Sequence, residues 1–141
     1  MKKSIYVIIF LIILVIMMIL LKNNVKYEQT IDNVQMRIKE GTVTNSSAVI
    51  IITDGNKVPY IYNTWYQIEK KDGDIWKKCE IRADNYMFTE QGIGMPKTGE
   101  MEVYVDWSKY YGMLENGEYR IIKHVYVNNE YENISANFKI E

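Results

Sequence analysis

The chain has 141 residues, with 17 Lys or Arg against 18 Asp or Glu, and it contains a single cysteine. The near balance of charge, without a cluster of basic residues, disfavours nucleic acid as a partner. One cysteine cannot form an internal disulfide, so stability must come from a hydrophobic core, which about 120 residues can supply.

An uncharged apolar run covers residues 5–21. At roughly 1.5 Å per residue it makes a helix of about 25 Å, the short end of what spans a membrane. A cleaved signal peptide would end in small residues, but the first glycine is Gly41 and the first alanine is Ala48. We therefore predict an uncleaved signal anchor with a transmembrane helix at residues 1–22. The alternative is a buried core helix, which would show a polar stripe.

The orientation of this anchor follows from its flanks. Lys2 and Lys3 precede the apolar run, while Lys22 and Lys26 follow it, so the positive-inside bias is small. A short N-terminal tail ahead of a large C-terminal domain favours the tail inside. We expect a single-pass protein of the cell membrane whose C-terminal domain is extracytoplasmic, with a polar stalk at residues 23–30.

The remaining residues, 31–141, have the patterns of short β-strands. Residues 34–38 alternate between apolar and polar side chains, the period of a half-buried strand. A β-branched run ends at the turn pair Asp54-Gly55, and two aromatic-rich segments flank Asp72-Gly73. Aspartate followed by glycine favours a tight turn, so the second pair predicts a hairpin.

The C-terminal third continues this pattern. Residues 99–107 alternate most regularly, and two further strands at 117–127 and 131–141 are separated by Asn128-Asn129, a predicted tight connection. Residues 108–114 predict one helical turn. Seven or eight short strands with turns at this spacing indicate an all-β fold, an antiparallel sandwich or barrel.

A tyrosine just past a turn glycine distinguishes between these architectures. Leu114, Gly117 and Tyr119 have the order found where a tyrosine turns its hydroxyl back onto upstream backbone at a corner of immunoglobulin-like sandwiches. Antibody domains have a cysteine two residues further on, whereas this chain has Ile121. We predict a structural corner without a disulfide; the alternative is a surface tyrosine after an ordinary turn.

Three stretches carry a resemblance to a known family: "WYQIEKKDGDIWKKC", "MEVYVDWSKYYGMLENGEYRIIK" and "SANFKI". They resemble the bacterial Ig-like domain of short membrane-anchored or lipoprotein chains in Gram-positive bacteria. The resemblance covers about residues 31–141 and implies an Ig-like antiparallel β-sandwich of seven or eight strands outside the membrane. It implies no catalytic residues. Unlike the lipoprotein members, this chain has no cysteine near its N-terminus to accept a lipid.

Residues that could support chemistry are few. His124 is the only histidine, and its place in a strand favours a solvent-facing or sheet-face residue over a general base. Cys79 has lysines before it but no second thiol to pair with. Asp72 and Asp74 lack the rest of a calcium loop and fit a hairpin turn better. We expect no enzymatic activity, no cofactor and no metal site.

The aromatic residues remain as candidates for binding. Exposed aromatics with polar neighbours suit a protein interface or a flat sugar-binding platform, although tyrosines also simply coat β-sheet surfaces. We predict a non-enzymatic binding or interaction module for an unknown protein or envelope component. The alternative is an envelope carbohydrate-binding module, and an edge strand that recruits a second chain stays open. The candidate binding face comprises Tyr62, Trp65, Tyr66 and Trp76.

Overall fold

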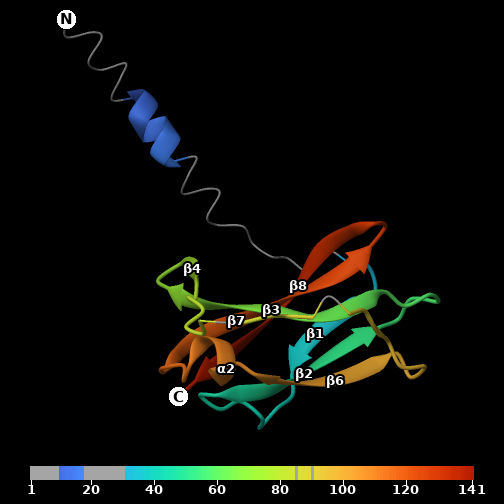
Figure 1. Cartoon of the computed structure of the whole chain (residues 1–141). Coiled ribbons are helices and arrows are strands. Elements are labelled where there is room, and N and C mark those ends of the chain that lie inside the picture. The colour runs from blue at the N-terminus through green and yellow to red at the C-terminus, as the bar shows by residue number, and fades with distance from the viewer. Residues whose placement is uncertain (1–9, 18–30, 85, 90) are drawn as a thin grey trace, which may run out of the picture.

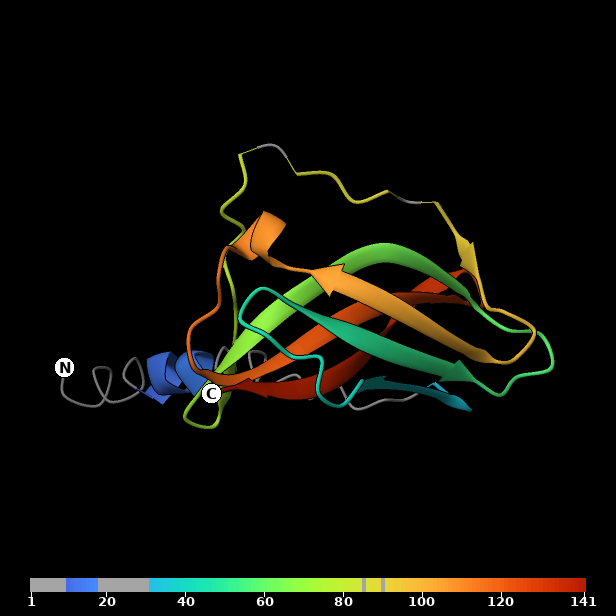
Figure 2. The same cartoon turned by 90° about the horizontal axis from the view of Figure 1, so that it is seen from below.

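Two antiparallel β-sheets pack face to face in the computed structural model of the chain (Figures 1 and 2). The structure describes residues 10–17, 31–84, 86–89 and 91–141. Its strands and its short helix are β1 Val34–Ile38, β2 Ser47–Asp54, β3 Ile61–Asp72, β4 Ile75–Lys78, β5 Ile93–Gly94, β6 Glu100–Asp106, α2 Ser108–Tyr111, β7 Gly117–Val127 and β8 Glu130–Ile140.

The smaller sheet has the order β1-β2-β6, and the larger sheet has the order β4-β3-β7-β8, with β5 paired to the start of β3. All of these pairings are antiparallel. The predicted all-β sandwich of seven or eight strands is therefore confirmed. Consecutive strands β3–β4 and β7–β8 form tight hairpins. The longer connections β1–β2 and β4–β5 also stay within one sheet, whereas β2–β3, β5–β6 and β6–β7 move the chain between the two sheets.

The turns of these two hairpins lie at the residues that the sequence predicted. Gly73, in the β3–β4 turn, has a φ of 61°. Asn128 and Asn129 join β7 to β8 and both have positive φ, at 50° and 68°. Asparagine tolerates this left-handed region better than most residues, and two positive φ values in succession are what a tight hairpin turn requires.

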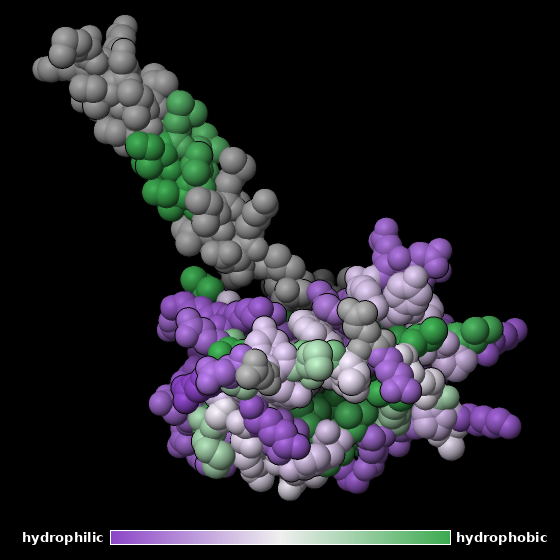
Figure 3. Space-filling model, in the orientation of Figure 1, coloured by the Kyte–Doolittle hydropathy of each residue, from purple (hydrophilic) through white to green (hydrophobic). Residues whose placement is uncertain are grey.

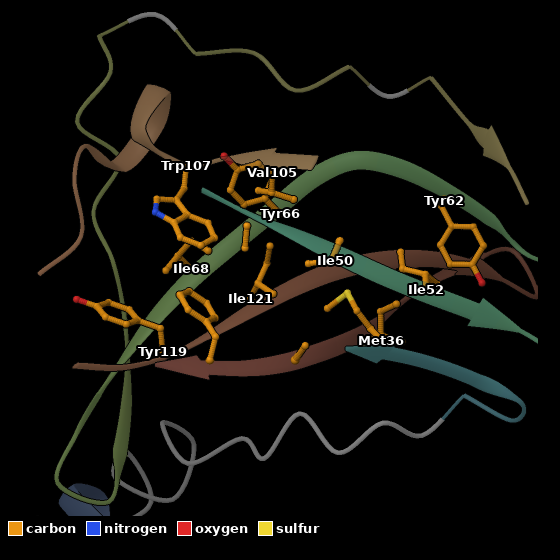
Figure 4. Close-up of a cluster of buried hydrophobic side chains, with 14 of the residues drawn as sticks. Met36, Ile50, Ile52, Tyr62, Tyr66, Ile68, Val105, Trp107, Tyr119 and Ile121 are labelled. Carbon is orange, nitrogen blue, oxygen red and sulfur yellow. The ribbon is translucent and has the colours of Figure 1, made fainter. Parts of the chain in front are cut away.

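The core lies between the two sheets and is rich in isoleucine and aromatic side chains (Figure 4). Trp107, fully buried, stacks on Phe138 with ring centroids 4.9 Å apart and donates its indole N–H to the carbonyl oxygen of Asn45 at 2.9 Å. Its ring therefore contributes apolar burial without leaving a polar atom unsatisfied, as large buried aromatics normally require.

Asp54, at the end of β2, is a buried carboxylate that organises the loop leading to β3. It accepts hydrogen bonds from the backbone and side chain of Asn56, from the backbone of Tyr60 and, at 2.8 Å, from the hydroxyl of Tyr62. Burial by itself would raise the pKa of Asp54, but these hydrogen bonds outweigh it and hold the pKa below its ordinary value.

The N-terminal region is described only in part. Residues 10–17 are helical and mostly exposed, but no helix among the described residues is long and apolar enough to cross a membrane. The rest of the predicted anchor and the predicted stalk at 23–30 lie outside the described residues.

Candidate functional site

The corner predicted from Leu114, Gly117 and Tyr119 lies at the start of β7. The Tyr119 ring is 2% exposed and stacks on Phe138, while its hydroxyl donates to the carbonyl oxygen of Glu115 at 2.8 Å. A Cβ added at Gly117 would lie 3.5 Å from the tyrosine ring and 3.1 Å from Cε of Lys70, so glycine lets the chain pass close to both groups. Leu114 is buried beside them.

The structure divides the four residues of the predicted binding face between two sides of the larger sheet. Tyr62 and Tyr66 point into the core and are 1% and 6% exposed (Figure 4). Their inclusion in an exposed face was wrong, because both lie on the inward side of β3, where their hydroxyls find partners inside the protein. Trp65 and Trp76 lie on the outer side and are half-buried.

These two tryptophans do not form one platform. Trp76 pairs across the hairpin with Lys71, which is six residues from Trp65 along β3. At about 3.3 Å per residue this is a separation of roughly 20 Å. Each tryptophan instead belongs to its own cluster on the outer face.

The first cluster is a line of four rings, Trp65, His124, Tyr131 and Tyr126, which we call the aromatic row. Trp65 and His124 are stacked, with centroids 3.6 Å apart and an interplanar angle of 15°. His124 contacts Tyr131 at 5.5 Å, and Tyr131 contacts Tyr126 edge-on at 5.3 Å. The row therefore crosses three adjacent strands, β3, β7 and β8, and its tyrosines are the most exposed members at 58% and 37%.

Three members of the row were not predicted as binding residues, although a signal for them exists in the sequence. Tyr126 and Tyr131 are equidistant from the Asn128-Asn129 turn, so a two-residue hairpin pairs them directly. His124 lies two residues before Tyr126 and therefore shares its face of the sheet.

The second cluster holds a buried ion pair on the same outer face. The Arg120 guanidinium lies over the Trp76 ring, 4.7 Å from its centroid, and its Nε donates to Glu69 at 2.7 Å. Gln67 donates to the other oxygen of Glu69 at 2.7 Å. Arg120 and Glu69 are 5% and 6% exposed, so removing one partner would leave a desolvated charge.

Lys123 connects the outer face to the interior. Its side chain is 2% exposed, and its ammonium group donates to the carbonyl oxygens of Asn63 at 2.8 Å and Trp65 at 3.1 Å. These carbonyls belong to the stretch of β3 where the pairing register with β7 shifts. Burial lowers the pKa of Lys123 to about 8. The lysine thus holds the irregular backbone that carries Trp65.

The remaining candidates for chemistry have structural surroundings. Burial lowers the pKa of His124, as does the neighbouring charge of Lys123. Burial raises the pKa of the Cys79 thiol, which makes the thiolate less available. Asp72 pairs with Lys77 within the β3–β4 hairpin. In the described part of the chain, no three His, Cys, Asp or Glu side chains come together in a group that could hold a metal ion.

Comparison with protein families identifies the class to which this geometry belongs. Residues 17–139 match the bacterial Ig-like domain, and the chain belongs to this family. The match begins upstream of β1 and ends within β8, so it includes both sheets. Neither the curated proteins nor the solved structures contain a significant match. Ig-like domains of this kind are generally non-catalytic, which fits an interaction module without enzymatic activity.

The tyrosine corner makes a direct prediction. Replacing Tyr119 with phenylalanine removes the hydroxyl and leaves the Glu115 carbonyl without this donor. We expect the free energy of unfolding to fall by about 1 to 3 kcal/mol, as for a lost buried hydrogen bond. Chemical denaturation measures it, with Tyr104→Phe as the control because that tyrosine is 66% exposed. An unchanged midpoint in Tyr119→Phe would show that the corner does not stabilise the fold.

Proposed function

We propose that the chain is a membrane-anchored, extracytoplasmic interaction module whose aromatic row binds a protein partner. The observation that carries this proposal is the row itself, a line of four contacting rings across three strands. Aromatic side chains dominate the binding energy at protein interfaces when they are clustered and surrounded by polar residues.

The surroundings of the row fit this role. Trp65 is held from behind by the lysine that binds its carbonyl and from one side by the stacked imidazole. Side chains that are already fixed lose little conformational freedom when a partner binds, which favours affinity. The neighbouring positions on β8 and its turn are polar, namely Asn129, Glu130 and Asn133. The row thus has rigid aromatic anchors with a polar rim.

A carbohydrate platform receives less support. It requires two or three coplanar rings side by side, and two of the four aromatics considered for it are in the core. In the row, His124 and Tyr131 are inclined by 35°, and Tyr126 and Tyr131 by 60°. Rings inclined in this way present an uneven surface, which suits a shaped protein surface better than a flat sugar.

Membrane anchoring rests on the sequence. The uncharged apolar run of residues 5–21 precedes the domain, and the short N-terminal tail ahead of it carries Lys2 and Lys3. This arrangement favours a tail inside and a domain outside. The sandwich would then face the cell envelope, where its partner would be found.

Photo-cross-linking tests the interface. We replace Tyr131 with p-benzoylphenylalanine in the full-length chain, expressed in cells that make it naturally, and expect a discrete cross-linked adduct. The same group in place of Met113, which is 55% exposed and lies in the loop after α2, should give none. Adding Trp65→Ala should reduce the adduct at position 131 at least fivefold without unfolding the domain. Equal cross-linking from both positions, or none from position 131, would contradict the proposed interface.

Labelling of a single cysteine tests the topology. Val58 is 81% exposed, so Val58→Cys in a Cys79→Ser background offers one accessible thiol. A membrane-impermeant maleimide should label this thiol on intact cells as fully as after lysis, and the protein should stay in the membrane fraction at alkaline pH. Labelling only after lysis would place the domain inside, and release into the soluble fraction would exclude the anchor.

A further inference from the structure

The outer edge of β6 is the starting point for a second binding site. β6 pairs with β2 on one side and is the last strand of the smaller sheet, and none of the strands described in the structure pairs with its other side. In constant-type immunoglobulin sandwiches the corresponding sheet has a fourth strand at this position. Among the described residues between 79 and 99, only Ile93–Gly94 form a strand, β5, and it pairs with β3 of the opposite sheet.

A cavity lies directly beside this edge. It has a volume of about 350 Å³, and β6 contributes Val103 and Val105 to its lining, with Tyr66 and Lys123 from the larger sheet and Met87 and Phe88 from the loop. Volumes of this size accommodate small ligands or side chains. In the space-filling view of Figure 3, hydrophobic side chains are recessed between more polar residues in the region between β3 and β6.

The loop that forms the far wall packs away from β6. The Thr64 hydroxyl donates to the carbonyl oxygen of Thr89 at 2.9 Å, and the Phe88 ring contacts Tyr66 at 5.2 Å and Tyr110 at 4.7 Å. These contacts fix the loop to β3 and to α2. Val103 shows the consequence, since it points inward like Met101 and Val105 but is only half-buried. No residue that the structure describes fills the place next to it.

Charge indicates what kind of strand fits. β6 carries Glu100, Glu102 and Asp106 and has no basic residue. Each of these acids has a basic partner: Arg37 for Glu100, Lys39 for Glu102 and Lys109 for Asp106. The three basic side chains are exposed, so these ion pairs are weak and can be exchanged for basic side chains of an added strand. A second copy of β6, paired antiparallel about Val103, would set Glu100 opposite Asp106, and like charges opposite each other are destabilising. A basic strand is attracted instead.

We propose that the outer edge of β6 and its cavity bind an extended segment of another protein, in which apolar side chains alternate with basic ones. The segment adds to the smaller sheet as a fourth strand through backbone hydrogen bonds. Its apolar side chains enter the cavity, and its basic side chains lie beside the acidic residues of β6. This site is separate from the aromatic row and does not depend on it.

The test uses the full chain in detergent micelles and a fluorescent seven-residue peptide of alternating lysine and valine. Fluorescence anisotropy should show binding at least tenfold tighter than for three controls. In these, glutamate replaces lysine, alanine replaces valine, or alternate backbone nitrogens are methylated to prevent strand pairing. Hydrogen exchange should slow in β6 when the peptide binds. Equal affinity for the methylated peptide, or protection in β7 and β8 in place of β6, would overturn the proposal.

Charge reversal locates the site. Glu102→Lys should weaken the lysine peptide at least fivefold and improve binding of the glutamate peptide. The control Glu118→Lys also breaks an exposed ion pair, with Lys71 on the larger sheet, and should change neither affinity. Equal effects of the two substitutions would show nonspecific attraction. If the chain self-associates and hydrogen exchange in β6 slows without peptide, the added strand is a second copy of this chain. That result would overturn the proposal.

Discussion

The hydroxyl groups of the buried tyrosines constrain this sandwich, because each must find a hydrogen-bond partner in a place that water does not reach. Without a disulfide, the core takes much of its volume from aromatic rings. Every buried ring that carries a hydroxyl or N–H group must donate it to an acceptor. The hydroxyl of Tyr62 donates to the Asp54 carboxylate, that of Tyr66 to the carbonyl oxygen of Asp106, and that of Tyr119 to the carbonyl oxygen of Glu115. Each bond ties the core to a loop or a strand end, so packing and loop conformation depend on each other.

The same constraint extends to the outer face through Lys123. Its ammonium group binds two carbonyls of the irregular stretch of β3, and one of them belongs to Trp65. Next to this register shift, Tyr66 lies in the core on one side of the sheet and Trp65 lies in the aromatic row on the other side. A buried lysine is costly unless its charge is met by acceptors, and here those acceptors belong to the strand segment that carries the proposed binding surface.

Much of the fold could be predicted from the sequence because alternation and turn chemistry are local. The strands, the turns at Gly73 and Asn128-Asn129, and the corner residues all follow from short stretches. The division of the aromatics was partly predictable as well. Trp65 and Tyr66 are adjacent in a strand, so they had to point to opposite faces.

Other features depend on contacts between distant segments and left no local signal. At the register shift in β3, backbone carbonyls are bound by Lys123 of β7, which is about 60 residues away along the chain. The cavity beside β6 exists because the loop after β4 packs on β3 and not on β6. The pairing of Arg120 with Glu69 depends on the register between β7 and β3, which neither strand specifies alone. These features depend on tertiary contacts, so the proposed sites that they form could be recognised only in the structure.

The partition of the aromatic residues between core and outer face underlies both proposed binding sites, and tyrosine ionisation measures it directly. Burial raises the pKa of Tyr62 and of Tyr66 well above the ordinary value of 10, and that of Tyr111 to about 12. Because the folded state holds these protons more tightly than the unfolded chain, stability falls as pH rises above 10.

In an absorbance titration of the full chain followed in parallel by circular dichroism, we expect these tyrosines to ionise only in the step that unfolds the sheets. Tyr62→Phe should remove one tyrosine from that step. Gradual ionisation of all 12 tyrosines while the β-sheet signal stays intact would contradict this partition of the aromatic residues.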